Sequence, residues 1–266
     1  MGSAGSASAR SAPEDLVALA AAVAREAGAL LQGHFRAGGL ASDAKSTPTD
    51  PVTEADRAAE RLIRDRVLAA RPDDAILGEE GSDVAGTSGV RWVVDPLDGT
   101  VNFLFGIPQW AVSIAVEDAA GVVAGVVFDP SRGELWAAER GGAALLDGAP
   151  VRGSERTELA TALVATGFGY DAEVRRVQAA TIADLLPDVR DVRRFGAAAL
   201  DLAWTAAGRF DAYYERGVQR WDVAAGGLIC ERAGLVVEEL PPAPPQDGGI
   251  FVATRALAAE LRGRIA

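Results

Sequence analysis

Several residue types are almost missing from this sequence of 266 residues. The single cysteine, Cys230, excludes an intrachain disulfide, and the helical pattern around it predicts a buried structural thiol. The single histidine, His34, argues against histidine-based catalytic triads and histidine-rich metal sites. Lys45 is the only lysine among the 26 basic residues, which makes its position worth following.

Long hydrophobic runs are also missing. No apolar run approaches the length of a bilayer and no signal peptide is visible, so we expect a cytoplasmic protein without a membrane partner. The formal net charge of −12 argues against direct binding of nucleic acid or an anionic membrane, because like charges repel.

The chain length suits one large domain with a substantial core. Residues 1–13 are small, polar and aperiodic, which predicts a disordered leader. No internal repeat or low-complexity linker interrupts the remainder. We therefore expect a single domain over residues 14–266, with an N-terminal half over about 14–152 and a C-terminal half over about 153–266.

Hydrophobic periodicity predicts helices and strands along this domain. The predicted helices cover residues 14–38, 53–70, 173–186, 197–207 and 222–233, and a last helix starts at Arg255. The predicted strands cover residues 75–77, 92–94, 111–116, 122–128, 135–138, 163–165, 189–193, 212–214, 235–238 and 250–253. A hairpin turn is predicted at Asp147-Gly148. The pattern favours an α+β fold with an antiparallel-rich sheet and a second, smaller mixed sheet.

Residues 92–103 read WVVDPLDGTVNF and place two acids directly after an apolar run. The apolar, β-branched start predicts a buried strand that stops at Asp95-Pro96. Asp95 and Asp98 then lie close together, and two like charges repel unless a cation or a shared proton compensates them. Gly99-Thr100 is a plausible helix start with free N–H groups for an anion. The acids and N–H donors together suggest metal-assisted phosphoryl chemistry, although an Asx-rich turn alone explains the hexapeptide.

Aspartyl-phosphate phosphatases offer a rival interpretation of this stretch. Their Asp-x-Asp-Gly-Thr loop places a nucleophilic aspartate two residues before an acid/base aspartate, whereas Pro96 occupies that position before Asp98. The spacing therefore removes a covalent carboxylate mechanism.

Further acids arrive at three other places. Asp56 follows Thr53 as in a helix cap, and Glu79-Glu80 follow a short strand. These acids and the Asp95 turn could meet at one sheet edge. Asp222 is expected to open the helix over residues 222–233, where an N-cap needs no further function.

Four separated segments together resemble the inositol monophosphatase family: D-P-V-T-x-x-D, G-E-E, D-P-L-D-G-T-x-N-F and W-D-x-A-A-G. The resemblance runs from about Glu14 to the C-terminus, and it is strongest to bacterial inositol-1-phosphatases. It implies a layered α/β/α/β/α sandwich of the sugar-phosphatase type. It also implies a Mg²⁺-dependent phosphomonoesterase that hydrolyses myo-inositol 1-phosphate by direct in-line attack of water.

The resemblance also assigns roles to residues of this chain. Two Mg²⁺ ions per subunit are implied, with a third held more weakly by Glu79. The implied ligands are Glu79, Asp95 and the Leu97 carbonyl for the first ion, and Asp95, Asp98 and Asp222 for the second. Asp56 and Thr100 match the pair that orients and deprotonates the attacking water, with Glu79 beside them. The implied substrate-binding residues are Leu97, Asp98, Gly99, Thr100, Arg193 or its neighbour Arg194, Gly196, Ala197, Ala198, Glu215 and Asp222.

Other expectations follow from the same resemblance. Lys45 falls where the family has a lysine near the metals, and Glu215 matches a carboxylate that bonds inositol hydroxyls. A homodimer and inhibition by Li⁺ are implied. Alternative substrates within the fold are histidinol phosphate, fructose 1,6-bisphosphate, nucleotide 3′-phosphates and NADP. A different class of function, as a partner protein of the transcription machinery with secondary catalysis, also stays open.

Overall fold

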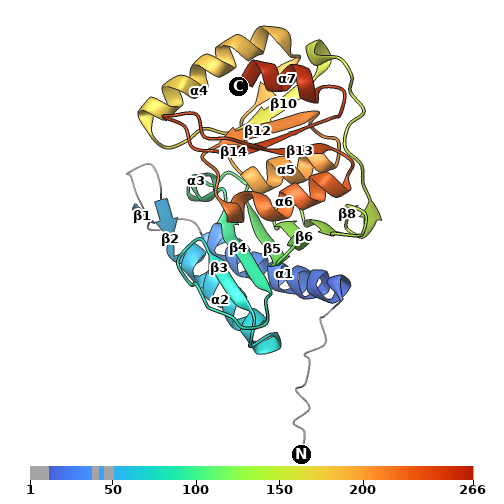
Figure 1. Cartoon of the computed structure of the whole chain (residues 1–266). Coiled ribbons are helices and arrows are strands. Elements are labelled where there is room, and N and C mark those ends of the chain that lie inside the picture. The colour runs from blue at the N-terminus through green and yellow to red at the C-terminus, as the bar shows by residue number, and fades with distance from the viewer. Residues whose placement is uncertain (1–11, 38–41, 45–50, 266) are drawn as a thin grey trace, which may run out of the picture.

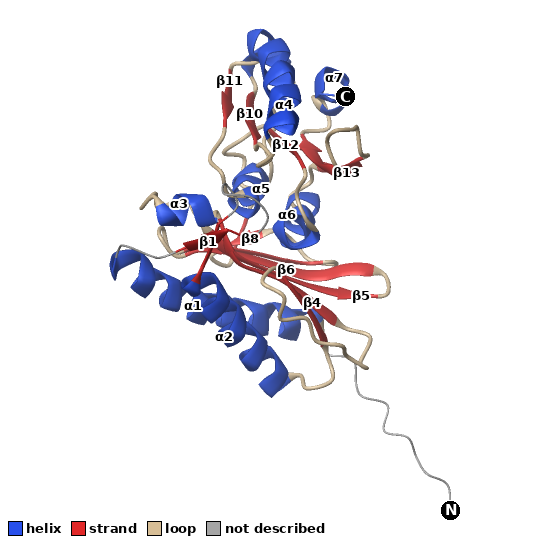
Figure 2. Cartoon of the chain, turned by 90° about the vertical axis from the view of Figure 1, so that its left-hand side faces the viewer, coloured by secondary structure: helices blue, strands red, loops and turns tan. Residues whose placement is uncertain are grey.

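The computed structural model describes residues 12–37, 42–44 and 51–265. Five layers follow one another in the order helices, sheet, helices, sheet, helices (Figures 1 and 2). The predicted α+β class and the α/β/α/β/α sandwich are confirmed. Most of the predicted leader, 1–13, lies outside the described residues, and the first helix begins at Pro13.

The first layer consists of α1 (Pro13–Ala37) and α2 (Glu54–Ala70). Apolar residues of α1 recur at helical spacing and are buried, among them Leu16, Ala20, Val23, Ala27 and Leu31. By length and composition α1 could cross a membrane, which corrects the expectation that no stretch is long enough. A buried core helix passes the same test, and α1 packs across β5 and β6 of the first sheet.

The first sheet has the strand order β3-β4-β5-β6-β7-β8-β9. Only β3 and β4 are parallel; the other neighbours are antiparallel, which confirms the predicted meander and hairpin. Its strands are β3 (Ala75–Gly78), β4 (Arg91–Asp98), β5 (Ala111–Asp118), β6 (Gly121–Asp129), β7 (Glu134–Glu139), β8 (Leu145–Leu146) and β9 (Ala149–Pro150). Helices cover both faces of this sheet, which explains why its central strands are apolar on both sides.

The third layer holds α5 (Ala198–Ala206) and α6 (Arg220–Arg232), packed between the two sheets. Alternate residues of β5 separate the two apolar cores. Val112, Ile114 and Val116 face α1 and α2, whereas Ala111 and Ala115 face α5 and α6. Cys230 lies buried in α6 with its Sγ donating to the Leu202 carbonyl at 3.1 Å, as expected for a structural thiol.

The second sheet is mixed, with the order β11-β10-β12-β14-β13. Strand β10 runs parallel to β11 and β12, whereas β14 runs antiparallel to β12 and β13. Its strands are β10 (Leu163–Thr166), β11 (Asp191–Arg193), β12 (Ala212–Arg216), β13 (Val236–Leu240) and β14 (Gly249–Ala253). The outer helices α4 (Ala172–Leu185) and α7 (Ala258–Ile265) cover its far face, and α7 begins later than predicted.

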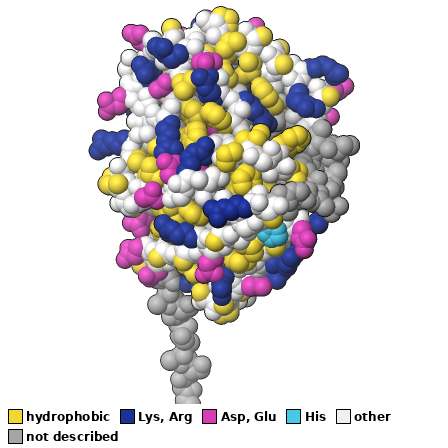
Figure 3. Space-filling view, turned by 180° about the vertical axis from the view of Figure 1, so that it is seen from behind, with side chains coloured by type: hydrophobic (Ala, Val, Ile, Leu, Met, Phe, Trp, Pro, Cys, Tyr) yellow, Lys and Arg dark blue, Asp and Glu magenta, His cyan; other side chains and the backbone are white. Residues whose placement is uncertain are grey.

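Short elements complete the described chain. A two-stranded sheet pairs β1 (Ser42–Ala44) with β2 (Pro51–Thr53), which the sequence pattern did not predict. The other short elements are α3 (Thr100–Leu104) and the 3-10 helices η1 (Leu159–Thr161) and η2 (Leu186–Asp188). On the face seen in Figure 3, acidic and basic side chains are both scattered among apolar ones, and neither sign forms one large patch.

Candidate active site

The carboxyl end of β4 forms the base of the candidate site. The strand was expected to stop at Asp95-Pro96, but it continues to Asp98. Its pairing with β5 shifts between Asp95 and Asp98, so this segment is a bulge rather than an end. Within the bulge the Leu97 N–H donates to Asp95 Oδ1 at 3.0 Å. A bulge of this kind re-aims side chains, and here it directs two acids to one place.

Strand β3 brings a third acid to the same place. It runs parallel to β4, and the Glu79 N–H donates to the Val94 carbonyl at 3.1 Å just beyond the end of β3. Burial raises the pKa of Asp95 well above its usual value, and the negative charges of Glu79, Asp98 and Asp222 raise it further. The predicted meeting of Glu79 with the Asp95 turn is therefore found in the structure.

Asp98 joins the first sheet to α5. Its two carboxylate oxygens accept the N–H groups of Ala198 and Ala199 at 3.1 and 2.8 Å. The N-cap residue of α5, Ala197, has no side chain that could cap the helix, so Asp98 caps it from another element. Burial raises the pKa of Asp98 to about 7, although these two hydrogen bonds oppose the rise.

Asp56 and Thr100 meet across 44 residues of sequence. Thr53 and Asp56 form the predicted capping box of α2, in which the Thr53 N–H donates to Asp56 Oδ2 at 2.9 Å. Gly99 caps α3 with a φ of 92°, a conformation that favours glycine, and Thr100 follows as the first helical residue. The Thr100 hydroxyl donates to Asp56 Oδ1 at 3.0 Å and lies 3.1 Å from the Leu97 carbonyl oxygen.

Asp222 reaches the same cluster from α6. It was expected to open the helix, but α6 begins at Arg220 with Gln219 as its N-cap, and Asp222 occupies the third helical position of a capping box. Asp222 Oδ2 accepts the Gln219 N–H at 2.6 Å. Burial raises the pKa of Asp222, with further contributions from Glu79 and Asp98. We call Glu79, Asp95, Asp98 and Asp222 the acidic floor.

Glu215 forms part of the opposite wall, which belongs to the second sheet. It lies on β12 and accepts a hydrogen bond from the Tyr213 hydroxyl at 2.7 Å. Burial raises the pKa of Glu215, whereas Tyr213 and the positive charge of Arg194 lower it. Gly167 leaves the space that Glu215 occupies, because a Cβ there would lie 1.9 Å from Glu215 Oε2.

A cleft of about 400 Å³ connects the floor with this wall. Its lining includes Gly99, Thr100, Leu97, Gly196, Ala198 and Glu215 together with the acidic floor. We call Arg194, Gly196 and Glu215 the rim. Arg193 is not among the lining residues; it lies 2.6 Å from Asp191 in an ion pair, while its neighbour Arg194 lines the cleft. Ala197 is not among the lining residues, although a Cβ at Gly99 would lie 3.2 Å from the Ala197 methyl group, and Lys45 falls outside the described residues.

The structure adds residues to which the sequence analysis assigned no role in the site. Tyr170, Gln219 and Trp221 also line the cleft. Asp201 in α5 is buried, and within the described chain neither of its carboxyl oxygens has a hydrogen-bond partner. Burial raises the pKa of Asp201 well above its usual value, and the charges of Glu215 and Asp98 add to this. An acid within the apolar run A-A-L-D-L was the available signal for this buried group.

Comparison with known proteins identifies the family. A sequence model described as the inositol monophosphatase family matches residues 12–264. The chain belongs to the inositol monophosphatase family. Inositol-1-monophosphatase SuhB of Mycobacterium tuberculosis (strain ATCC 25618 / H37Rv) is 50% identical over 255 residues, which cover 92% of this chain and 88% of the relative.

More distant members agree with this assignment. Nus factor SuhB of Escherichia coli (strain K12) is 40% identical over 83% of this chain and 84% of its own length. The crystal structure of extragenic suppressor protein suhB from Bartonella henselae gives a TM-score of 0.87 at 35% identity, over 94% of this chain and 98% of that chain. The predicted membership of the inositol monophosphatase family is confirmed, and this family member is a phosphatase.

Proposed function

We propose that this inositol monophosphatase family member hydrolyses myo-inositol 1-phosphate to inositol and phosphate, with Mg²⁺ as cofactor. The observation that supports this most directly is the hydrogen bond from Thr100 to Asp56 at 3.0 Å, beside an acidic floor supplied by β3, β4 and α6. A phosphatase needs an activated water and compensation for the charge of a phosphoryl group. These side chains offer the chemistry for both.

The donor set of the floor fits Mg²⁺. Carboxylate and carbonyl oxygens are the ligands that this hard cation prefers, and a divalent cation would offset the repulsion that raises the pKa values of Asp95 and Asp222. Within the described residues, no three acidic, histidine or cysteine side chains converge as closely as in a formed metal centre. The fit therefore concerns donor chemistry and position. Glu79, Asp95 and the Leu97 carbonyl would hold one ion, and Asp95, Asp98 and Asp222 a second, with Glu79 contributing to a weaker third.

Bound Mg²⁺ would lower the pKa of a coordinated water and neutralise charge on the phosphoryl oxygens. Thr100 and Asp56 then provide a route for the proton. Because the Thr100 hydroxyl donates to Asp56 Oδ1, its oxygen is free to accept a proton from water while its own proton passes to Asp56. Thr53 keeps Asp56 in place through the capping box. The attack is direct and needs no phosphoenzyme.

The rim would determine which alcohol is accepted. Glu215 lies in the cleft lining and can accept hydrogen bonds from hydroxyl groups of a polyol. Arg194, rather than Arg193, lies where it can contact the phosphate ester or its ring. Gly99 and Thr100 also line the cleft at the start of α3, where their N–H groups would suit phosphoryl oxygens. Histidinol phosphate, fructose 1,6-bisphosphate, nucleotide 3′-phosphates and NADP are the competing substrates.

The decisive experiment measures phosphate release from these five kinds of phosphate ester, with and without Mg²⁺. We expect Mg²⁺-dependent turnover with a preference of at least about tenfold in kcat/KM for inositol 1-phosphate, because Glu215 pairs with its hydroxyls. Preference for another ester would retain the metal chemistry and overturn the substrate. Equal turnover in EDTA would overturn the metal chemistry. Li⁺ at limiting Mg²⁺ is expected to inhibit, and a homodimer in the cytoplasm is the expected form.

A second candidate function is a protein-partner role in transcription. The observation that favours it is the name Nus factor SuhB borne by a relative 40% identical to this chain. An Asp95→Asn variant separates the two functions in cells. A deletion phenotype that this inactive variant rescues would favour the partner role, whereas failure to rescue would favour catalysis.

A further inference from the structure

Two side chains of β5 hold the first turn of α6. Ser113 donates its hydroxyl to the Trp221 carbonyl at 3.2 Å, and Glu117 accepts a hydrogen bond from Arg220 Nε at 2.6 Å. Ser113 and Glu117 extend from the face of β5 that is turned towards α6. Both attachments end within two residues of Asp222, so β5 determines where this part of the acidic floor lies.

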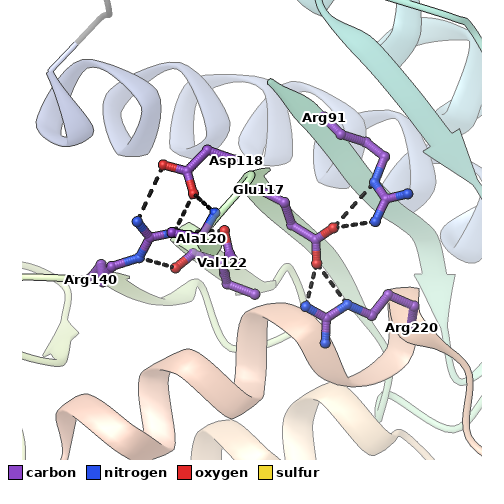
Figure 4. Close-up of polar contacts among 8 residues, drawn as sticks. Arg91, Glu117, Asp118, Ala120, Val122, Arg140 and Arg220 are labelled. Atoms are coloured by element: carbon purple, nitrogen blue, oxygen red, sulfur yellow. Dashed lines mark hydrogen bonds and ion pairs between the residues drawn. The ribbon is translucent and has the colours of Figure 1, made fainter. Parts of the chain in front are cut away.

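Glu117 is the more strongly anchored of the two. It is 5% exposed and lies on a strand that pairs with β4 on one side and β6 on the other. Figure 4 shows its carboxylate between two arginines. One oxygen faces Arg220 of α6, and the other accepts Arg91 Nη2 at 2.5 Å at the start of β4. A buried carboxylate with charged partners on both sides is held firmly in place. The two arginine side chains are partly exposed, so the carboxylate is the better anchored partner of each pair.

The first turn of α6 needs such an anchor. Asp222 lines the same cleft as Glu79 and Asp98, and carboxylates gathered there repel one another, which acts to move the helix end away from the cleft. Its own capping bond to Gln219 fixes Asp222 within α6 but does not fix α6 on the sheet. The ion pair of Arg220 with Glu117 supplies that second restraint. Neither Glu117 nor Arg220 lines the cleft.

We propose that Glu117 is a positioning residue that acts through Arg220 to hold Asp222 at the acidic floor. The inference rests on the proposed function, since Asp222 affects metal binding only if the floor holds Mg²⁺. Losing a residue that orients a metal ligand typically lowers metal affinity or activity about 10- to 100-fold. Losing this attachment should therefore weaken metal binding more than it lowers turnover at saturating metal.

The two arginines provide a matched pair of variants. Arg220→Gln and Arg91→Gln each remove one ion pair from the same carboxylate, but only Arg220→Gln removes an attachment of α6 to β5. The first measurement is equilibrium binding of Mn²⁺, followed through the free-ion electron paramagnetic resonance signal. We expect Arg220→Gln to weaken binding about tenfold and Arg91→Gln by less than about twofold. The Mg²⁺ concentration for half-maximal phosphate release should shift in parallel, with kcat at saturating Mg²⁺ within about threefold of the unmodified protein.

A double-variant cycle tests the route through Arg220. If Glu117 acts through Arg220, Glu117→Gln and Arg220→Gln together should weaken Mn²⁺ binding no more than either alone. Asp118→Asn is the control, because Asp118 is next to Glu117 on the same strand and its ion pair is with Arg140, which lies outside α6 (Figure 4). It should leave Mn²⁺ binding unchanged.

Three results would overturn the inference. Equal effects of Arg91→Gln and Arg220→Gln would show that Glu117 only ties the sheet together. Additive effects in the cycle would separate Glu117 from Arg220. Unaltered Mn²⁺ binding in Arg220→Gln, with a metal-dependent unmodified enzyme, would reject this inference alone, whereas an unmodified protein that neither binds Mn²⁺ nor needs Mg²⁺ would reject the proposed function as well.

Discussion

The floor and the rim of the cleft are built in different ways. At the floor, Asp95 is fixed by a partner two residues away, through the bulge bond from Leu97, and beside the floor Asp56 is fixed by Thr53 three residues away, through the capping box. At the rim, Glu215 depends on the space left by Gly167, which lies 48 residues earlier in the sequence. These two local bonds can form within their own short motifs, whereas Asp98 and Asp222 of the floor, and the whole rim, take their places only after distant elements have assembled. The floor should therefore determine whether the enzyme is active, and the rim should determine which substrate it hydrolyses.

The largest effect is expected at the floor. Asp95→Asn removes the acid to which both metal positions are assigned, so we expect a loss of more than about 100-fold in kcat on every substrate, beyond the usual cost of an outer residue. Phosphate release at saturating Mg²⁺ measures it. Activity within tenfold of the unmodified enzyme would remove Asp95 from the proposed metal site.

A smaller and selective effect is expected at the rim. Glu215→Gln removes a charged acceptor for hydroxyl groups and should lower kcat/KM for inositol 1-phosphate about tenfold, since hydrogen bonds to charged groups contribute about 1.5–3 kcal/mol. Turnover of a generic aryl phosphate should change by less than about twofold. Gly167→Ala is the companion variant, because its added methyl group displaces Glu215 without removing it. Equal losses on both substrates would contradict a specificity role for the rim.

The smallest effect is expected between floor and rim, at Asp201. Its raised pKa means that the folded state favours the protonated acid, so its ionisation destabilises the fold as pH rises above the unfolded value near 4. Asp201→Asn should therefore raise the free energy of unfolding by about 1 kcal/mol at pH 8. Below about pH 4 the substitution should leave the free energy of unfolding unchanged, because the acid is then protonated in both states. Thermal unfolding in EDTA measures the difference. A gain that is independent of pH would assign the effect to packing instead of charge.

The same contrast explains what could be predicted from the sequence. Periodicity and turn residues located nearly every helix and strand of the two main sheets, because covered faces need apolar side chains at fixed spacing. The pairing of β1 with β2 escaped prediction because such short strands carry little pattern. The extension of β4 to Asp98 escaped because Pro96 signals a strand end, and only the partner strand β5 reveals the bulge.

In the candidate site, too, residues in short motifs were easier to predict than residues positioned by tertiary contacts. Short motifs placed Asp56, Asp95 and Asp98 without knowledge of the fold. The sequence pattern could not decide between Arg193 and Arg194. Successive strand residues point to opposite sides, and β11 ends at Arg193. That end is set by tertiary pairing with β10, which no local pattern states.

The solitary thiol of Cys230 has a practical consequence. It is fully buried in α6, it donates to the Leu202 carbonyl, and burial raises its pKa well above the ordinary value, so it should resist alkylating reagents while the protein stays folded. A cysteine introduced at Tyr170, which lines the cleft and is 43% exposed, would then be the one reactive position. The native sequence is thus a ready background for attaching a single fluorophore or spin label at the cleft mouth.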